Sequence, residues 1–271
     1  MERQSSASRT GSSKFRLPRT LERPSFNEIP QTALLAAAPE LGDTSIEFIR
    51  KKLLATAPQM LAGTSALSLS HLPNALPKRS LPPYITVPLF PRQECIFPTH
   101  ALAISNTSPS VPAEMHTIFP IHALVLAAHC SKLPQLPPTA PRASSSVHLP
   151  VLPLTLPSAP AFSILLAFMY THRLDAVLTA LFPIPPRFLH ALTHKAVRAA
   201  LQSGADLHHL SAHLCAASSS NMQLLMTHTV HVKELWQDMV ALGIDDAALW
   251  DTVELAYEIV LGALNLGAMS R

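Results

Sequence analysis

The chain has 271 residues, of which 48% are hydrophobic and 14% charged, and this composition excludes a largely disordered polymer. Its formal net charge is +3. Residues 1–23 hold six basic and two acidic groups, and the other 14 basic and 15 acidic groups sum to −1. We therefore predict a disordered basic tail over residues 1–30 and no direct binding of nucleic acid by the folded part.

The sequence also predicts the compartment. The N-terminus lacks the apolar core of a secretion signal. No run of eighteen apolar residues occurs, and the best candidate, 161–182, is interrupted by charged side chains. Three cysteines, Cys95, Cys130 and Cys215, are odd in number and far apart, which argues against a disulfide framework. We predict an intracellular protein in a reducing compartment that does not bind membranes.

Residues 31–83 are predicted to hold one short helix and a connector. Asp43–Thr56 has apolar residues at helical spacing, and Pro58 is expected to stop the helix. Residues 61–83 are rich in serine and proline and predict an irregular connector.

Residues 84–186 show short apolar runs separated by proline, which is typical of a small β-sheet. All 26 prolines of the chain lie at or before Pro186. Because proline cannot donate to a β-ladder, we expect most of these strands to be short or at an edge. The stretch Ser105–Glu114 predicts a turn. The predicted strands are Tyr84–Val87, Ala101–Ile104, Met115–Phe119 and Val147–Leu156.

A short frame, Ile-Phe-Pro-x-His-Ala-Leu, occurs twice within this region, beginning at Ile96 and at Ile118. Two copies fall short of the roughly three repeats that a solenoid needs. We interpret the two copies as similar entries into strands.

Residues 187–271 contain no proline and predict an all-helical module. Polar side chains that cap free backbone N–H groups mark the helix starts, and glycine marks the ends. The last helix carries an apolar stripe that includes Leu249, Val253 and Tyr257. The predicted helices are Arg187–Ser203 ended by Gly204, a second capped by Asp206 and running through Ala217, a third capped by Ser220 or Asn221 and running through Leu242 before Gly243, and a fourth capped by Asp245.

Histidine offers the strongest indication of a metal site. The tightest cluster is His208, His209, His213 and Cys215. His209 and His213 are four residues apart and share a helix face, which suits a metal, but Cys215 lies off that face. His228 and His231 would complete a site only if two helices pack antiparallel. A metal-dependent enzyme or zinc-binding protein that uses this cluster stays the alternative function, and we assign no metal ligand.

Covalent catalysis is indicated only weakly. His129, Cys130 and Ser131 place a base beside nucleophiles in sequence, but consecutive residues of a helix point in different directions. The chain has no Gly-x-Ser-x-Gly elbow, and none of its seven glycines forms a phosphate loop. We predict no enzymatic activity, no catalytic residue and no cofactor, with Cys130 buried as a small apolar residue.

Carboxylates accumulate in the last two predicted helices. We expect most of them to form a solvated face, and the functional interpretation is a surface for a basic partner such as a DNA-binding protein. Trp236 and Trp250 are expected to anchor these helices to each other. The residues that bind the partner are not located by the sequence. The carboxylates are Glu234, Asp238, Asp245, Asp246, Asp251, Glu254 and Glu258.

Two stretches follow known patterns. Phe119–Ser131 has Phe-x-x-His-x-x-Val-Leu-Ala-Ala before a serine, and Phe162–Leu174 has Phe-x-x-Leu-Leu-x-Phe-x-Tyr-Thr-x-x-Leu. Both resemble signatures of the BTB/POZ domain, a fold that binds proteins and has no catalytic machinery. The resemblance implies an α+β fold in which residues 84–186 form a degenerate BTB/POZ-like domain, a small sheet with flanking helices, followed by the helical module. Pro120 and the prolines of the central strand argue against BTB-type dimerisation, and self-association is left open.

Longer stretches carry a second resemblance. They are LPPYITVPLFPRQECIFPTHALAISNTSPS, FPIHALVLAAHC, AFMYTHRLDAVL, HHLSAHLCAAS and VKELWQDMVALG, which cover most of residues 81–266. These stretches resemble the clampless proteins of mushroom-type and smut fungi. That likeness implies a regulator of sexual development, needed for clamp connections and the dikaryon. It would act downstream of mating-type homeodomain factors as an adaptor for these or other transcription factors, in the nucleus, with the cytoplasm left open.

Overall fold

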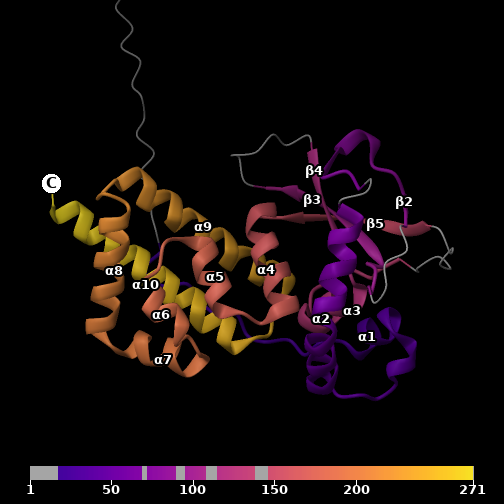
Figure 1. Ribbon diagram of the computed structural model, residues 1–271, viewed down its shortest axis with the longest axis horizontal. Helices are drawn as coiled ribbons and strands as arrows, with labels where there is room; N and C mark the ends of the chain where they lie inside the picture. Colours follow the sequence, from indigo (N-terminus) through magenta and orange to yellow (C-terminus); the bar gives the residue numbers. More distant parts are fainter. Residues whose placement is uncertain (1–17, 69–71, 90–94, 108–114, 138–145, 271) are drawn as a thin grey trace, which may run out of the picture.

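The computed structural model describes residues 18–68, 72–89, 95–107, 115–137 and 146–270. An α+β part comes first and a helical module second (Figure 1). The predicted α+β class is therefore confirmed. The predicted turn at Ser105–Glu114 lies outside the described residues from position 108 onward, as do the first seventeen residues of the predicted tail.

The α+β part contains three α-helices, two short 3-10 helices and five strands among the described residues. The helices are α1 (Gln31–Ala37), η1 (Pro39–Leu41), α2 (Ile46–Ser68), η2 (Lys78–Ser80) and α3 (Ala123–His129). The strands are β1 (Ala75–Pro77), β2 (Tyr84–Pro88), β3 (His100–Asn106), β4 (Met115–Ile121) and β5 (Ser146–Leu156), and their order in the sheet is β1-β4-β3-β5-β2. All four predicted strands are present, and β1 was not predicted.

The sheet accommodates proline through the way β5 is paired. Within the described residues, 146–150 pair with β2 and 151–156 pair with β3, so each half has one neighbour. Val151 N donates to the Pro83 carbonyl at 2.9 Å, on the β2 side. Because N–H groups alternate in direction along a strand, Pro153 turns its nitrogen away from β3 and Pro150 turns its nitrogen away from β2. The strand is long and interior, contrary to the expectation, yet neither proline removes a ladder bond.

Pro58 does not stop the first long helix, which was predicted to end before it. α2 continues to Ser68 with Pro58 inside it. A proline within a helix costs about 3 kcal/mol. Burial after the proline offsets this cost, since Met60 and Leu67 are buried and Gln59 accepts a hydrogen bond from Ile96 N at 3.1 Å. The predicted connector therefore contains the end of α2 and the strand β1.

Two apolar cores lie on the two faces of the sheet. Alternation along β3 sends Leu102 and Ile104 into the larger core, and Ala101 and Ala103 into the smaller one under the end of α2. The larger core continues without a break into the helical module, where it includes Val260. One apolar core therefore joins both parts of the chain.

The helix α4 (Ala159–Thr171) lies between the two parts and packs against α2, α3 and α9 (Figure 1). The rest of the chain is helical. It consists of α5 (Leu174–Leu181), α6 (Pro186–His190), α7 (His194–Gln202), α8 (Gly204–Ala217), α9 (Met222–Leu242) and α10 (Ala247–Met269), which together form the helical module.

Some predicted caps of the helical module are correct. Asn221 caps α9 by accepting hydrogen bonds from the backbone N–H groups of Gln223 and Leu224 at 3.0 and 3.3 Å. Gly243 ends α9 with a φ of 65°, in the left-handed region where glycine is favoured. These two predictions depend on local chemistry only, and both are confirmed.

Other predicted caps are wrong. Ser203, not Asp206, caps α8 by accepting from Asp206 N at 3.1 Å, so Gly204 begins a helix and does not end one. The predicted first helix is divided, because Thr193 starts α7 by accepting from Ala196 N at 3.2 Å. Asp246 caps α10, where Asp245 was predicted. For α8 and α10, a polar side chain three residues before and one residue after the predicted cap, respectively, provides an equally good acceptor.

The helix α10 is long and apolar enough to cross a membrane by length and composition, although the sequence pattern had indicated no such segment. Of its most apolar window, 56% is buried, and it packs against α7, α8 and α9. This burial identifies α10 as the central helix of the module.

Candidate functional site

The segment that leads into α1 crosses the helical module, although it was predicted to be a disordered tail. We call residues 18–30 the strap. Leu21 and Ile29 of the strap pack against the larger core. The strap runs from the helical module to α1 as the first coloured trace of Figure 1. The described part of the predicted tail therefore lies against the folded part of the chain.

The strap is held by aromatic side chains that donate hydrogen bonds to its backbone. The hydroxyl of Tyr257 on α10 donates to the carbonyl of Pro18. The indole Nε1 of Trp236 on α9 donates to the carbonyl of Glu22 at 3.2 Å. Both contacts use main-chain acceptors, so they do not depend on which side chains the strap carries.

Arg23 makes a polar side-chain contact from the strap to the helical module. Its guanidinium pairs with Asp251, whose side chain is 16% exposed, and lies 5.9 Å from the ring centre of Trp250. His194 Nε2 contacts the other Asp251 oxygen at 2.7 Å. Burial raises the pKa of Asp251, but the hydrogen bonds and charges of His194 and Arg23 outweigh burial and hold the pKa below its usual value. Trp236, Trp250, Asp251 and Tyr257 together form what we call the strap face.

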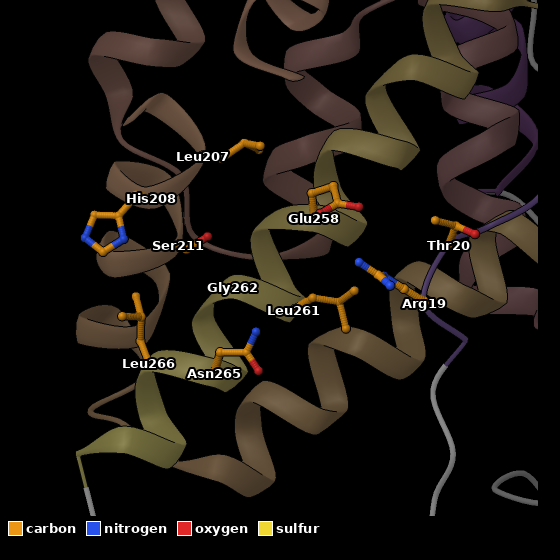
Figure 2. A pocket seen from close by; sticks show the side chains of 10 residues that line it. All are labelled: Arg19, Thr20, Leu207, His208, Ser211, Glu258, Leu261, Gly262, Asn265 and Leu266. Atoms are coloured by element: carbon orange, nitrogen blue, oxygen red, sulfur yellow. The ribbon is translucent and has the colours of Figure 1, made fainter. Parts of the chain in front are cut away.

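A cavity of about 580 Å³ lies beside the strap, between α8 and α10. Figure 2 shows Arg19 and Thr20 approaching from the strap, opposite His208 and Ser211 of α8, with Glu258 and Asn265 presented by α10. The α8 and α10 backbones are close here, since a Cβ on Gly262 would lie 2.3 Å from Ser211 Oγ. The cavity therefore adjoins the strap face, with a mixed lining in which the polar groups lie beside Leu207, Leu261 and Leu266.

The predicted acidic face is not a single solvated surface. Asp238 is fully buried, Asp251 is paired with Arg23, and Asp246 caps α10 while lying 3.7 Å from His172. Glu254 is exposed and Glu258 lines the cavity. Trp250 is buried as predicted, and its Nε1 donates to the Ile244 carbonyl at 2.9 Å.

The distribution of charge along the sequence indicates this site, whereas the spacing of residues within motifs does not. Positive charge is concentrated in the first 23 residues and negative charge in α9 and α10. Opposite charges at the two ends of a chain favour their contact, but only the fold shows that Arg23 reaches Asp251.

The predicted histidine cluster is not brought together into a metal site. His208 and His209 are exposed on α8, while Cys215 is buried with its sulfur 3.6 Å from Ser220 Oγ. His228 Nδ1 donates to the Leu181 carbonyl at 3.1 Å. No group of three or more histidine, cysteine, aspartate or glutamate side chains within the described ranges could hold a metal ion.

Cys130 lies in surroundings that suppress its thiolate. The side chain is 1% exposed, its sulfur is 3.9 Å from that of Met169, and burial raises its pKa to about 12. Burial also lowers the pKa of the neighbouring His129 to about 4, while its Nδ1 donates to the Val125 carbonyl at 2.8 Å. A buried neutral thiol is a poor nucleophile, so the geometry favours the packing role that the sequence predicted for Cys130.

Two side chains from the BTB-like stretches meet in the interior. The Tyr170 hydroxyl donates to His122 Nδ1 at 2.7 Å and accepts from His122 N at 3.2 Å, while His122 Nε2 donates to the Ile96 carbonyl at 3.0 Å. The rings of Phe119 and Phe162 also pack edge to face, with centres 5.1 Å apart. The two patterns therefore describe one packed junction between β4, α3 and α4.

A second junction joins α3 to the loop after α9. Ser131 N and Lys132 N donate to the carbonyls of Gly243 and Leu242 at 3.1 and 3.0 Å. Cys130 and Ile244 form an isolated antiparallel bridge beside them. These backbone bonds attach the helical module directly to the α+β part.

These features define a two-part α+β and helical protein whose polar contact surface lies on the helical module. Residues 24–157 match the family model described as the Clampless protein 1 N-terminal domain, and residues 175–271 match the Clampless protein 1 C-terminal domain. The chain belongs to the clampless protein family, and this membership indicates a role in clamp formation in fungi. Neither the curated proteins nor the solved structures gave a match.

Proposed function

We propose that the chain acts in clamp formation as a non-enzymatic adaptor that binds another regulator through the helical module. The observation that carries this proposal is the strap face, where the aromatic donors Trp236 and Tyr257 and the carboxylate of Asp251 lie beside a cavity. Tyrosine, tryptophan and arginine side chains are enriched where proteins bind one another. The nearby carboxylates Glu254 and Glu258 favour a partner with a basic surface.

The partner in this proposal is a transcription regulator, such as a homeodomain protein, met in the nucleus of mating cells. DNA-binding proteins carry clustered positive charge, which complements the carboxylates of α10. The proposal extends to maintenance of the dikaryon, which clamp connections accompany. Imaging of a fluorescent fusion in mating hyphae tests the location: exclusion from nuclei would contradict it.

Affinity purification from mating cells tests the binding function. We expect wild-type chain to recover a transcription regulator and a chain with Glu254→Lys and Glu258→Lys to lose it. The matched control carries Glu40→Lys and Asp43→Lys, which are exposed in the α+β part, and it should behave as wild type. Restored clamp connections in a deletion strain provide the biological readout. Equal recovery by the wild-type and α10 variants would reject the proposal.

The scaffold that presents this surface is, in our proposal, a BTB/POZ-like core. Support comes from the junction that joins the two patterns, through the His122–Tyr170 hydrogen bonds and the Phe119–Phe162 ring contact. An experimentally determined structure superposed on BTB/POZ domains tests the assignment. Equivalent placement of β3, β4, α3 and α4 is expected, and a different path of the chain through these elements would reject it.

A further inference from the structure

The strap occupies a surface that is built to hold an extended chain. Two donors, Tyr257 and Trp236, bind the carbonyls of Pro18 and Glu22, which are four residues apart. An extended segment from any protein offers carbonyls at the same spacing, because main-chain acceptors are common to all sequences. The strap face therefore binds backbone in a way that another segment could reproduce.

One pocket of the strap face determines which side chain of a bound segment is favoured. Asp251 and Trp250 receive the guanidinium of Arg23, which combines an ion pair with an approach to an aromatic ring. A planar guanidinium suits both contacts better than a lysine ammonium does. The carboxylate of Glu258 in the adjoining cavity adds negative charge beside Arg19. The surface thus favours a segment that carries arginine.

The strap itself is held weakly enough to be displaced. No side chain between residues 18 and 30 is fully buried, and only Leu21, Pro24 and Ile29 are half-buried. Exposed ion pairs and single hydrogen bonds each contribute little to stability. A segment attached in cis nevertheless competes at a high effective concentration, on the order of millimolar for a short tether.

We propose that the strap face is a docking surface for an extended, arginine-bearing segment of a partner protein, and that the strap occupies this surface until such a segment displaces it. The inference rests on the proposed function in taking the partner to be a protein. It adds the chemistry of the bound segment and an internal competitor. The cavity beside Arg19 supplies room for further side chains of the partner segment.

The test uses the full chain and a fluorescein-labelled peptide that copies residues 18–26 (PRTLERPSF). Arg23→Ala in the chain weakens the strap but leaves the pocket intact. We expect this variant to bind the peptide at least about fivefold more tightly than wild type does, by fluorescence anisotropy, because the internal competitor has lost its ion pair and ring contact. A peptide with glutamate at the position of Arg23 should bind the Arg23→Ala variant no more tightly than it binds wild type.

Two further variants locate the binding. Asp251→Asn and Tyr257→Phe, each combined with Arg23→Ala, should weaken peptide binding, whereas Glu40→Ala, placed in the α+β part, should not. Trp236 and Trp250 are the two tryptophans of the chain, so their fluorescence reports both peptide binding and an intact fold. The proposal is overturned if Arg23→Ala binds no more tightly than wild type, if the glutamate peptide binds equally, or if sedimentation shows that the straps exchange between two copies.

The outcomes separate this inference from the proposed function. A chain that binds the peptide but recovers no regulator from mating cells would keep the docking surface and reject the adaptor role. A chain that recovers a regulator but never binds the peptide would reject the docking surface alone.

Discussion

Asp238 is fully buried at the joint between α9 and the N-terminus of α4. One carboxyl oxygen accepts from Ser158 N at 3.1 Å, and the other has no hydrogen-bond partner among the described residues. Burial raises the pKa of Asp238 to about 8; the Ser158 N–H opposes this shift and the charge of Glu234 adds to it. The carboxyl is therefore largely protonated at neutral pH, and a predicted surface carboxylate becomes part of the joint between the two parts.

Replacing Asp238 by asparagine should stabilise the protein increasingly as pH rises. The native carboxyl keeps its proton up to about pH 8, whereas the unfolded one releases it near 3.8. The native state then binds more protons than the unfolded state, so this group lowers the free energy of unfolding by up to about 1.4 kcal/mol per pH unit as pH rises through that interval. Asp238→Asn removes this dependence of the free energy of unfolding on pH, and the asparagine keeps a side-chain oxygen that can accept the hydrogen bond from Ser158 N.

Urea unfolding of Asp238→Asn and wild type between about pH 5 and about pH 8 measures the effect. Buried His129, whose pKa burial lowers to about 4, changes stability in the opposite direction. Its contribution is common to both proteins and cancels in their difference. Parallel stability profiles would show that the carboxyl of Asp238 is charged in the native state.

At the scale of elements, the end of α9 requires glycine at position 243 for two reasons. Its φ of 65° is strained for residues with a Cβ, and a Cβ there would lie 2.3 Å from Ser131 Oγ. We expect Gly243→Ala to lower the free energy of unfolding by about 1–3 kcal/mol, through strain and displacement of Ser131. Thermal unfolding followed by circular dichroism measures it.

The matched control for this substitution is Gly204→Ala. Gly204 begins α8, and a Cβ there would meet no atom within 4 Å. Alanine at this helix position should change stability by less than about 1 kcal/mol, and in the stabilising direction. Equal destabilisation by the two substitutions would mean that the left-handed end of α9 and its contact with Ser131 are not what Gly243 provides.

The two copies of Ile-Phe-Pro-x-His-Ala-Leu show how far sequence alone predicts the elements. The copy from Ile96 enters strand β3 at His100, as predicted. The copy from Ile118 is already in β4, and its His122 precedes the helix α3, so the second prediction is wrong. The same frame takes different structures in its two places, and in the second His122 is bound by Tyr170, which is distant in sequence. Tertiary contacts override propensity here, as they also do for α2 beyond Pro58.

At the scale of the whole molecule, the sequence predicted the α+β and helical parts but not their connection. Proline content and helical spacing are local signals. They predicted the four strands and a helical module from residue 187, whereas the run of helices after the sheet begins at α4 (Ala159–Thr171). The strap needs a contact between Arg23 and Asp251, and no local pattern encodes a pair 228 residues apart. The candidate site was missed for this reason, although the basic N-terminal residues and the carboxylate of Asp251 were both noted in the sequence.

The two parts should unfold as one cooperative unit. The larger core runs without a break from Ile49 of α2 through Phe162 of α4 to Val260 of α10. Opening the helical module alone would expose the buried face of α4 and leave Asp238 without its Ser158 partner. Both tryptophans lie in the helical module, whereas far-ultraviolet circular dichroism also reports α2. We expect the two signals to share one urea midpoint.

Phe162→Ala provides the decisive variant, because Phe162 is fully buried outside the helical module and packs on Phe119. It should lower the free energy of unfolding by about 3–5 kcal/mol. The tryptophan-detected transition should shift with the dichroism, although both tryptophans lie on other helices, α9 and α10. Phe48→Ala is the control, since Phe48 is 53% exposed and should cost no more than about 0.5 kcal/mol. A tryptophan transition that stays in place while the dichroism shifts would establish two independently stable domains and leave α4 as a linker between them.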